Sequence, residues 1–173
     1  LFLGPERLYP APRMAEESAV VRCFLVMPFS LEWSNDVHKA LAAACKAMSV
    51  TPVRGDDLFT PTDILVDIWQ SINAADIVVA DITGRNPNVL YELGVAHTLA
   101  KPVLIISRHA ADIPIDLSTR RIILYGQSED DWREDLGMKV TKAITEILRM
   151  YGSSATVPEL VEPASQSAVM ASG

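Results

Sequence analysis

Residues 74–107 read AADIVVADITGRNPNVLYELGVAHTLAKPVLIIS, and this stretch decides the fold. It holds an apolar run at 77–80, a polar turn, a helical pattern over about 87–100 and a second apolar run at 103–106. Strand, helix and strand in this order form a βαβ unit, whose two strands are parallel and buried on both faces. Ligands of open parallel sheets bind outside the carboxyl ends of the strands, so the turn at 81–86 is the first candidate site.

The helix predicted in this stretch carries a carboxylate in an apolar setting. Asn86 is a favourable N-cap, and Pro87 suits the first helical position, where its missing N–H leaves no bond unmade. Glu92 lies on the flank of an apolar stripe formed by Val89, Leu93, Ala96 and Ala100. A carboxylate in such surroundings is costly unless it is paired or partly hydrated. Two interpretations follow: Glu92 leans toward the strand ends as a functional group, or it faces water at the rim of the domain.

Similar patterns continue on both sides of this unit. Apolar runs at 21–27 and 122–125 and a short stretch at 51–54 predict three further strands. Helical spacing follows Ser34 or Asn35, which are N-cap candidates, and recurs within 62–73 and 130–151. The alternation predicts an α/β fold, namely a doubly wound, mostly parallel five-stranded sheet of flavodoxin-like order 2-1-3-4-5.

The length of 173 residues fits one domain with a substantial core. Residues 1–20 contain several prolines near their start, and residues 152–173 are rich in serine, alanine and proline without periodicity. These stretches predict a flexible leader and a flexible tail around a domain at 21–151. Hydrophobic residues make up 49% and charged residues 21% of the chain, as in globular proteins.

Charge and composition exclude several classes of function. The net charge of −7 and the pI near 4.9, without a cluster of basic residues, argue against direct binding to a nucleic-acid backbone. No apolar run is long enough to span a membrane, and the start lacks the shape of a signal peptide, so we expect a cytoplasmic protein. Cys23 and Cys45 fit buried core thiols, and cysteine and histidine do not cluster at metal spacing.

Familiar cofactor and nucleophile motifs are absent from the chain. It contains neither GxGxxG nor GxxxxGK[ST], so a resident dinucleotide and a P-loop phosphate site are not predicted. It also lacks the GxSxG nucleophile elbow. We therefore expect no metal and no resident cofactor.

The switch point of the predicted sheet lies between its first and third strands, where several polar residues and one ring converge. The candidate substrate-binding residues around this crevice are Phe29, Ser30, Asp57, Asp81, Asn86 and Asn88, and the candidate catalytic residue is Glu92. An aromatic ring, amides and carboxylates suit a ligand made of a base and a ribose. Two assignments have a structural alternative: Phe29 as a core residue and Asp81 as a turn or capping residue.

Several segments carry a resemblance to a known family. They are Met27-Pro28-Phe29, residues 75–83 (ADIVVADIT), residues 86–97 (NPNVLYELGVAH) and Lys101-Pro102-Val103. Together they resemble the nucleoside 2-deoxyribosyltransferase superfamily, and in particular its bacterial TIR-like, predicted nucleotide-binding branch. The resemblance spans about 22–125, nearly all of the expected domain.

The resemblance implies a role for the helix glutamate. In the transferases, the glutamate before the Leu-Gly pair is the catalytic nucleophile, which corresponds to Glu92. In TIR-domain NADases, a glutamate of similar placement engages the ribose and supports loss of nicotinamide. The transferases usually have an aspartate six residues before the nucleophile, where this chain has Asn86, and Asp67 lies near another acidic position of the family.

The resemblance thus implies cleavage of the N-glycosidic bond of a nucleoside, nucleotide or NAD-like small molecule, by hydrolysis or base exchange, with NAD as a substrate and not a cofactor. It also implies a homo-oligomer, and the acidic charge and the flexible ends suit a part of a larger assembly. The alternatives are a non-catalytic TIR-like module that senses a nucleotide or assembles with copies of itself, and a structural domain without a ligand.

Overall fold

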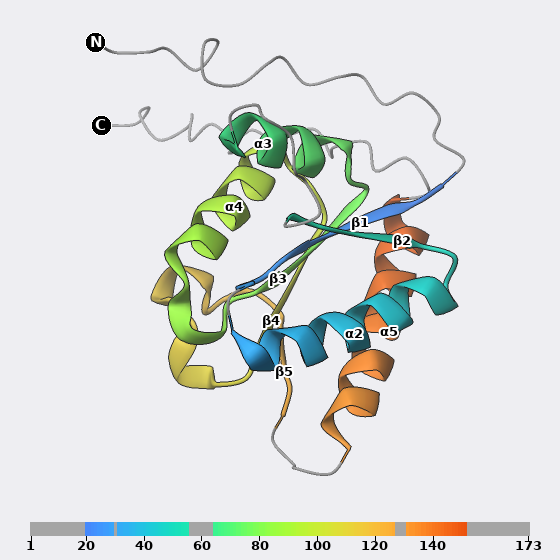
Figure 1. The fold of residues 1–173 in the computed structure, drawn as a ribbon, viewed down its shortest axis with the longest axis vertical. Helices are drawn as coiled ribbons and strands as arrows, with labels where there is room; N and C mark the ends of the chain where they lie inside the picture. The colour runs from blue at the N-terminus through green and yellow to red at the C-terminus, as the bar shows by residue number, and fades with distance from the viewer. Residues whose placement is uncertain (1–19, 30, 56–63, 127–130, 152–173) are drawn as a thin grey trace, which may run out of the picture.

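The computed structural model describes residues 20–29, 31–55, 64–126 and 131–151. Within them the chain forms a five-stranded sheet of order β2-β1-β3-β4-β5 in which all neighbouring strands are parallel (Figure 1). The strands are β1 (Arg22–Val26), β2 (Thr51–Arg54), β3 (Ile77–Asp81), β4 (Val103–Ser107) and β5 (Ile122–Leu124). The prediction of a doubly wound α/β sheet of order 2-1-3-4-5 is confirmed.

The connections between the strands contain both α-helices and short 3-10 helices. The α-helices of the described residues are α2 (Glu32–Ala47), α3 (Ile64–Ala74), α4 (Pro87–Thr98) and α5 (Trp132–Tyr151). The 3-10 helices are η2 (Thr83–Arg85), η3 (Ala110–Asp112) and η4 (Ile115–Leu117). The link from β4 to β5 contains η3 and η4 in place of an α-helix.

Helices cover both faces of the sheet. α2 and α5 run side by side on one face, and α3 and α4 pack on the other (Figure 1). Side chains alternate between the two faces along β1, so Cys23, Leu25 and Met27 enter the core under α2 and α5, while Phe24 and Val26 enter the core under α3 and α4. Because both faces are covered, β1, β3 and β4 are almost continuously apolar, whereas β2 at the edge of the sheet is not.

β3 is the central strand and places the candidate site. It pairs with β1 on one side, where Val26 lies beside Ala80, and with β4 on the other, where Ile106 lies beside Asp81. All residues of β3 are buried. Asp81 ends this strand, so the candidate carboxylate lies inside the protein at the carboxyl edge of the sheet.

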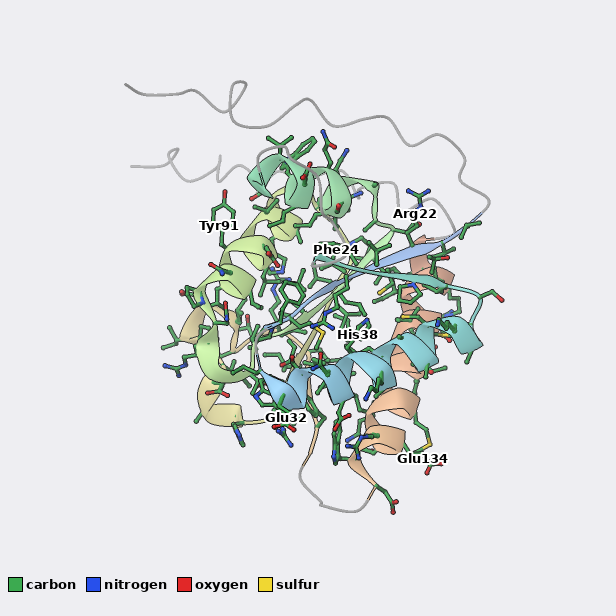
Figure 2. All side chains as sticks on the ribbon, viewed as in Figure 1. Arg22, Phe24, Glu32, His38, Tyr91 and Glu134 are labelled. Atoms are coloured by element: carbon green, nitrogen blue, oxygen red, sulfur yellow. The ribbon has the colours of Figure 1, made fainter. Side chains whose placement is uncertain are left out.

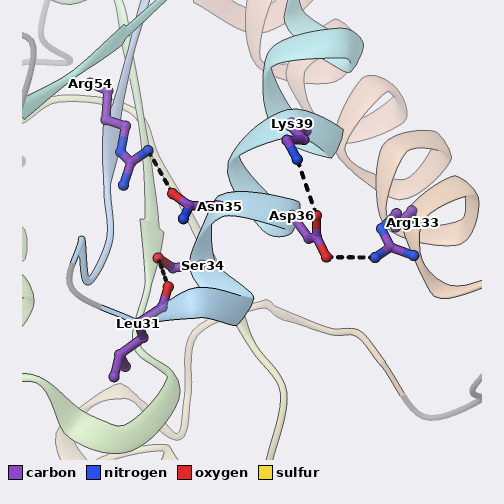
Figure 3. A network of polar contacts seen from close by, with 7 residues as sticks. All are labelled: Leu31, Ser34, Asn35, Asp36, Lys39, Arg54 and Arg133. Atoms are coloured by element: carbon purple, nitrogen blue, oxygen red, sulfur yellow. Dashed lines mark hydrogen bonds and ion pairs between the residues drawn. The ribbon is translucent and has the colours of Figure 1, made fainter.

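The start of α2 differs from its prediction. The helix begins at Glu32 after Leu31, so the predicted N-caps Ser34 and Asn35 are wrong. Leu31 provides no side-chain cap. Ser34 lies in the first turn instead, and its hydroxyl donates to the carbonyl oxygen of Leu31 at 2.7 Å (Figure 3). A hydroxyl can satisfy a carbonyl from within the helix, and spacing alone does not distinguish this role from an N-cap.

An exposed ion pair joins the two helices of one layer. Arg133 of α5 lies 2.6 Å from a carboxylate oxygen of Asp36 of α2, and Lys39 approaches the other oxygen at 3.5 Å (Figure 3). The hydrogen bond from Arg133 is the largest cause that lowers the pKa of Asp36. Exposed pairs of this kind contribute little to stability, so the buried apolar contacts account for the packing of α2 on α5. No helix of the described residues is long and apolar enough to cross a membrane.

Candidate active site

The start of α4 is fixed by its cap. The side-chain oxygen of Asn86 accepts hydrogen bonds from the backbone N–H groups of Asn88 at 2.9 Å and Val89 at 3.4 Å, and Pro87 occupies the first turn. The cap engages the Oδ1 atom of Asn86, which leaves its amide NH₂ as the group that can meet a ligand. Asn88 is exposed at the same helix end.

Glu92 lies in the second turn of α4 and points inward. The preceding residue, Tyr91, points outward from the helix and is 46% exposed (Figure 2), whereas Glu92 is 7% exposed. Glu92 shares the buried side of the helix with Val89, Leu93 and Ala96. Of the two interpretations of the sequence, the structure excludes the one in which Glu92 faces water at the rim of the domain.

The carboxyl group of Glu92 lacks a compensating partner in the part of the chain that the structure describes. Among the described residues, nothing forms a hydrogen bond or an ion pair with it. Because neither carboxyl oxygen of Glu92 is among the fully enclosed side-chain atoms that lack a partner, these oxygens are not fully enclosed, and solvent reaches them. Burial raises the pKa of Glu92 from 4.5 to about 7. A buried carboxyl group that titrates near neutral pH, without a partner that explains its burial, is typical of a functional group.

Asp81 is enclosed, in contrast to Glu92, and its oxygens are occupied. One oxygen accepts hydrogen bonds from the backbone N–H of Thr83 at 3.0 Å and from its hydroxyl at 2.5 Å. The other accepts a hydrogen bond from the hydroxyl of Tyr125 at 2.6 Å. Burial raises the pKa of Asp81, and these hydrogen bonds oppose the rise. Asp81 is 0% exposed, so it presents no atom to a ligand in this arrangement and acts as a turn residue.

Phe29 follows β1 and joins two strand ends. The guanidinium carbon of Arg54, the last residue of β2, lies 4.9 Å from the centre of the Phe29 ring. A Cβ atom added to Gly55 would lie 3.1 Å from the tip of the ring, so glycine allows this close approach. Arg54 also donates to the side-chain oxygen of Asn35 at 3.4 Å (Figure 3). Phe29 is partly buried against the core under α2 and α5, so its ring has both a packing role and an accessible part.

Two predicted substrate-binding residues, Ser30 and Asp57, lie outside the described residues. Asp67 lies in the first turn of α3 and is half-buried. No group of three or more histidine, cysteine, aspartate or glutamate side chains that could hold a metal ion occurs in the described part of the chain. The structure thus brings Asp81, Asn86 and Glu92 to one segment, the turn after β3 and the start of α4.

Sequence reasoning missed three residues around Asp81. Thr83 follows Asp81 in a spacing typical of turns in which side chains bond the backbone, and this signal could have been found. Tyr125 directly follows β5 and is 44 residues away from Asp81, so no local sequence pattern predicts the contact. Arg108 follows β4, and its backbone N–H donates to the Thr83 hydroxyl at 3.0 Å.

The lysine of the Lys-Pro pair has a structural role at the opposite edge of the sheet. The ammonium group of Lys101 donates to the carbonyl oxygens of Asn73 at 2.6 Å and Ala75 at 2.9 Å. These bonds tie the end of α3 to the turn before β4. Burial lowers the pKa of Lys101. This part of the resemblance therefore concerns the scaffold and not the candidate site.

The fold of this chain is similar to that of two solved enzymes. No family model and no curated protein matches the chain. The solved 2-deoxyribosyltransferase of Bacillus psychrosaccharolyticus matches with a TM-score of 0.50 and 21% identity over 68% of this chain and 90% of that protein. The CMP N-glycosidase BcmB of Clostridium botulinum matches with a TM-score of 0.51 and 16% identity over 68% of this chain and 98% of that protein. At these identities the likeness shows a shared fold.

Proposed function

We propose that this chain cleaves the N-glycosidic bond of a nucleoside, nucleotide or NAD-like substrate, with Glu92 as the catalytic residue. The observation that carries the proposal is the buried carboxyl group of Glu92, which lacks a partner among the described residues and has a pKa raised to about 7. The fold shared with a 2-deoxyribosyltransferase and a CMP N-glycosidase supports the class of reaction. The resemblance to the TIR-like branch extends the substrate class to NAD.

The environment of Glu92 suits covalent catalysis. A carboxylate with few water molecules around it is a stronger nucleophile than a fully hydrated one, and a pKa of about 7 leaves a large ionised fraction at neutral pH. In the proposed first step, a carboxylate oxygen bonds to the anomeric carbon. The bond from that carbon to the base nitrogen breaks, and the base leaves with the electron pair. The base of a nucleoside or nucleotide then takes up a proton from water, whereas nicotinamide leaves NAD as a neutral ring. The product of this step is an ester between the sugar and Glu92.

The second step frees the enzyme. Attack by water on the anomeric carbon breaks the ester, returns the carboxylate and releases the sugar, as in retaining glycosidases. Attack by a second base at the same carbon yields a new nucleoside. Hydrolysis and base exchange differ only in which acceptor reaches this carbon.

The neighbouring residues have supporting roles in this proposal. In this proposal, the amide NH₂ of Asn86, whose oxygen caps α4, and the exposed side chain of Asn88 donate to sugar hydroxyls. The ring of Phe29 packs on the base, and Asp81 shapes the turn from below. Ser30 and Asp57 remain predicted substrate contacts.

A second candidate function is binding without turnover, in a TIR-like module that senses a nucleotide or assembles with copies of itself. The observation that favours it is Asn86, which stands where the transferases usually have an aspartate and whose oxygen caps α4. An amide binds a hydroxyl or a base edge but does not act as an acid.

Base release separates the two candidates. The protein and its Glu92→Gln variant are incubated with NAD, nucleosides and nucleoside monophosphates, and released bases are quantified by chromatography. We expect release by the wild type and its loss in the variant. A matched control is Glu134→Gln, which replaces an exposed glutamate on the other face (Figure 2) and should retain activity. Unchanged release by Glu92→Gln would contradict the mechanism. Ligand-induced thermal stabilisation without release would favour the sensing module.

A further inference from the structure

A closed set of hydrogen bonds lies beneath the turn that leads into α4. We call it the Asp81 clasp, formed by the side chains of Asp81, Thr83 and Tyr125 and the backbone N–H of Arg108. Asp81 and Tyr125 are 0% exposed and Thr83 is 6% exposed. The clasp joins the carboxyl ends of β3, β4 and β5, so it spans three of the five strands at the sheet edge that carries the candidate site.

Each donor and acceptor of the clasp has a defined partner. The Thr83 hydroxyl donates to one oxygen of Asp81 and accepts from the backbone N–H of Arg108. The Tyr125 hydroxyl donates to the other oxygen of Asp81. Buried polar networks that are fully satisfied fix one geometry, whereas apolar contacts of the same volume tolerate sliding. The clasp therefore specifies where Thr83 lies relative to three strands.

The aromatic surroundings of Arg108 support the same position. Its guanidinium carbon lies between 5.7 and 5.9 Å from the ring centres of Trp33, Tyr125 and Trp132. Gly126 has φ of +70°, and a Cβ atom there would lie 3.3 Å from the side-chain Nε of Arg108. The Arg108 side chain is thereby held on the side of α2 and α5, while its backbone N–H reaches Thr83.

The turn is held from the solvent side as well. The backbone N–H of Gly84 donates to a carboxylate oxygen of Asp112 at 2.9 Å. The guanidinium group of Arg85 donates to the carbonyl oxygens of Asp112 and Ala111 in η3. η2 is therefore held by the clasp on its buried side and by η3 on its exposed side. Asn86, the N-cap of α4, follows η2 directly.

We propose, on the basis of the function proposed above, that Thr83 and Tyr125 are positioning residues that hold the start of α4 and thereby fix the position of the Glu92 carboxyl group. A helix transmits a shift at its first turn to the following turns because its backbone hydrogen bonds make it stiff. Glu92 lies six residues after Asn86, less than two turns along α4. A substitution that loosens the clasp therefore moves the carboxyl group of Glu92, although no residue next to Glu92 is replaced.

The test uses substitutions that remove one hydroxyl each. Tyr125→Phe removes the donor to Asp81, and Thr83→Val removes the hydroxyl of Thr83, which Thr83→Ser restores. Ile144→Val is the matched control, because Ile144 is buried in the same core as Tyr125 but takes no part in the clasp. The first readout is the titration of the Glu92 carboxyl carbon by NMR, which needs no substrate. The second is kcat and KM for base release.

We expect the pKa of Glu92 to fall from about 7 toward its ordinary value of 4.5 in Tyr125→Phe and Thr83→Val, since a displaced carboxyl group gains water. It should stay near 7 in Thr83→Ser and Ile144→Val. We expect kcat to fall about 10- to 100-fold in the first pair, as for a reacting group displaced by about 1 Å, with KM changed less than threefold.

The readouts also separate the inference from the proposed function. A folded Tyr125→Phe or Thr83→Val variant with the wild-type pKa of Glu92 and the wild-type kcat overturns the inference. If Tyr125→Phe does not fold, the Thr83 pair decides. If the wild type releases no base, the proposed function fails, and the NMR titration alone tests whether the clasp positions Glu92.

Discussion

Replacing Glu92 with glutamine should stabilise the folded chain at pH 8 and have a much smaller effect at pH 5. The carboxyl group is 7% exposed, and burial is the cause that raises its pKa from 4.5 to about 7. A group with a raised carboxyl pKa binds more protons in the folded state than in the unfolded state between these two values. The free energy of unfolding therefore falls as the pH rises through this window and is lowest above it. Glutamine has no charge to bury at any pH.

The magnitude follows from the pKa. One pKa unit corresponds to about 1.4 kcal/mol, so the rise from 4.5 to about 7 makes ionised Glu92 destabilising by about 3 kcal/mol above pH 7. At pH 5 most of this effect is absent, and less than about 1 kcal/mol remains. A gain of about 3 kcal/mol corresponds to a rise in Tm of roughly 10 °C for a domain of this size.

Urea denaturation at pH 5 and pH 8 measures both values directly. Glu134→Gln serves as the control, because it removes an exposed glutamate from α5 and should change stability by less than about 0.5 kcal/mol at either pH. If Glu92→Gln is no more stable than the wild type at pH 8, or gains equally at both pH values, the carboxyl group is not held in a poorly hydrated site. This measurement is independent of catalysis.

Three further predictions concern the residues around Glu92. Phe29→Ala should raise KM about tenfold with little change in kcat, because stacking of a base on an aromatic ring is worth about 1–3 kcal/mol; steady-state kinetics of base release measure it. Asn86→Ala should lose about 1 kcal/mol of stability with its cap, and Asn86→Asp should keep it, as urea denaturation of both will show. Gly126→Ala should lower Tm more than Gly84→Ala: both have positive φ, but only at Gly126 does the new Cβ meet Arg108.

Much of the fold was predictable because its signals are local. The apolar run of β3 and the Asn86–Pro87 start of α4 identify a βαβ unit, and the handedness of such units restricts the order of the strands. The start of α2 was not predictable in the same way. Ser34 bonds a carbonyl group within its own helix, and only the structure shows that Leu31 precedes the helix without a side-chain cap.

In the candidate site, too, local features were predictable and contacts between distant segments were not. Spacing on the helical wheel placed Glu92 beside the apolar stripe, and the structure buries it there. Spacing did not show whether a partner accompanies it, since a partner can come from any element. For the same reason the contact between Tyr125 and Asp81, which are 44 residues apart, could not be predicted from the sequence around either residue. The sequence showed Asp81 as an acidic residue at a strand end, but not that its oxygens face the interior.

Two carboxyl groups at one sheet edge are buried in opposite ways, and this contrast separates scaffold from chemistry. Asp81 accepts three hydrogen bonds and lies near the positive charge of Arg108, and these contacts oppose the rise that burial causes in its pKa. Glu92 has no such compensation among the described residues, and its pKa rises accordingly. A carboxyl group whose replacement by glutamine raises stability does not support the fold, so its presence indicates a function. A destabilising carboxyl group beside a clasp that fixes its helix is what an active site requires, and the pH dependence of Glu92→Gln measures that cost separately from turnover.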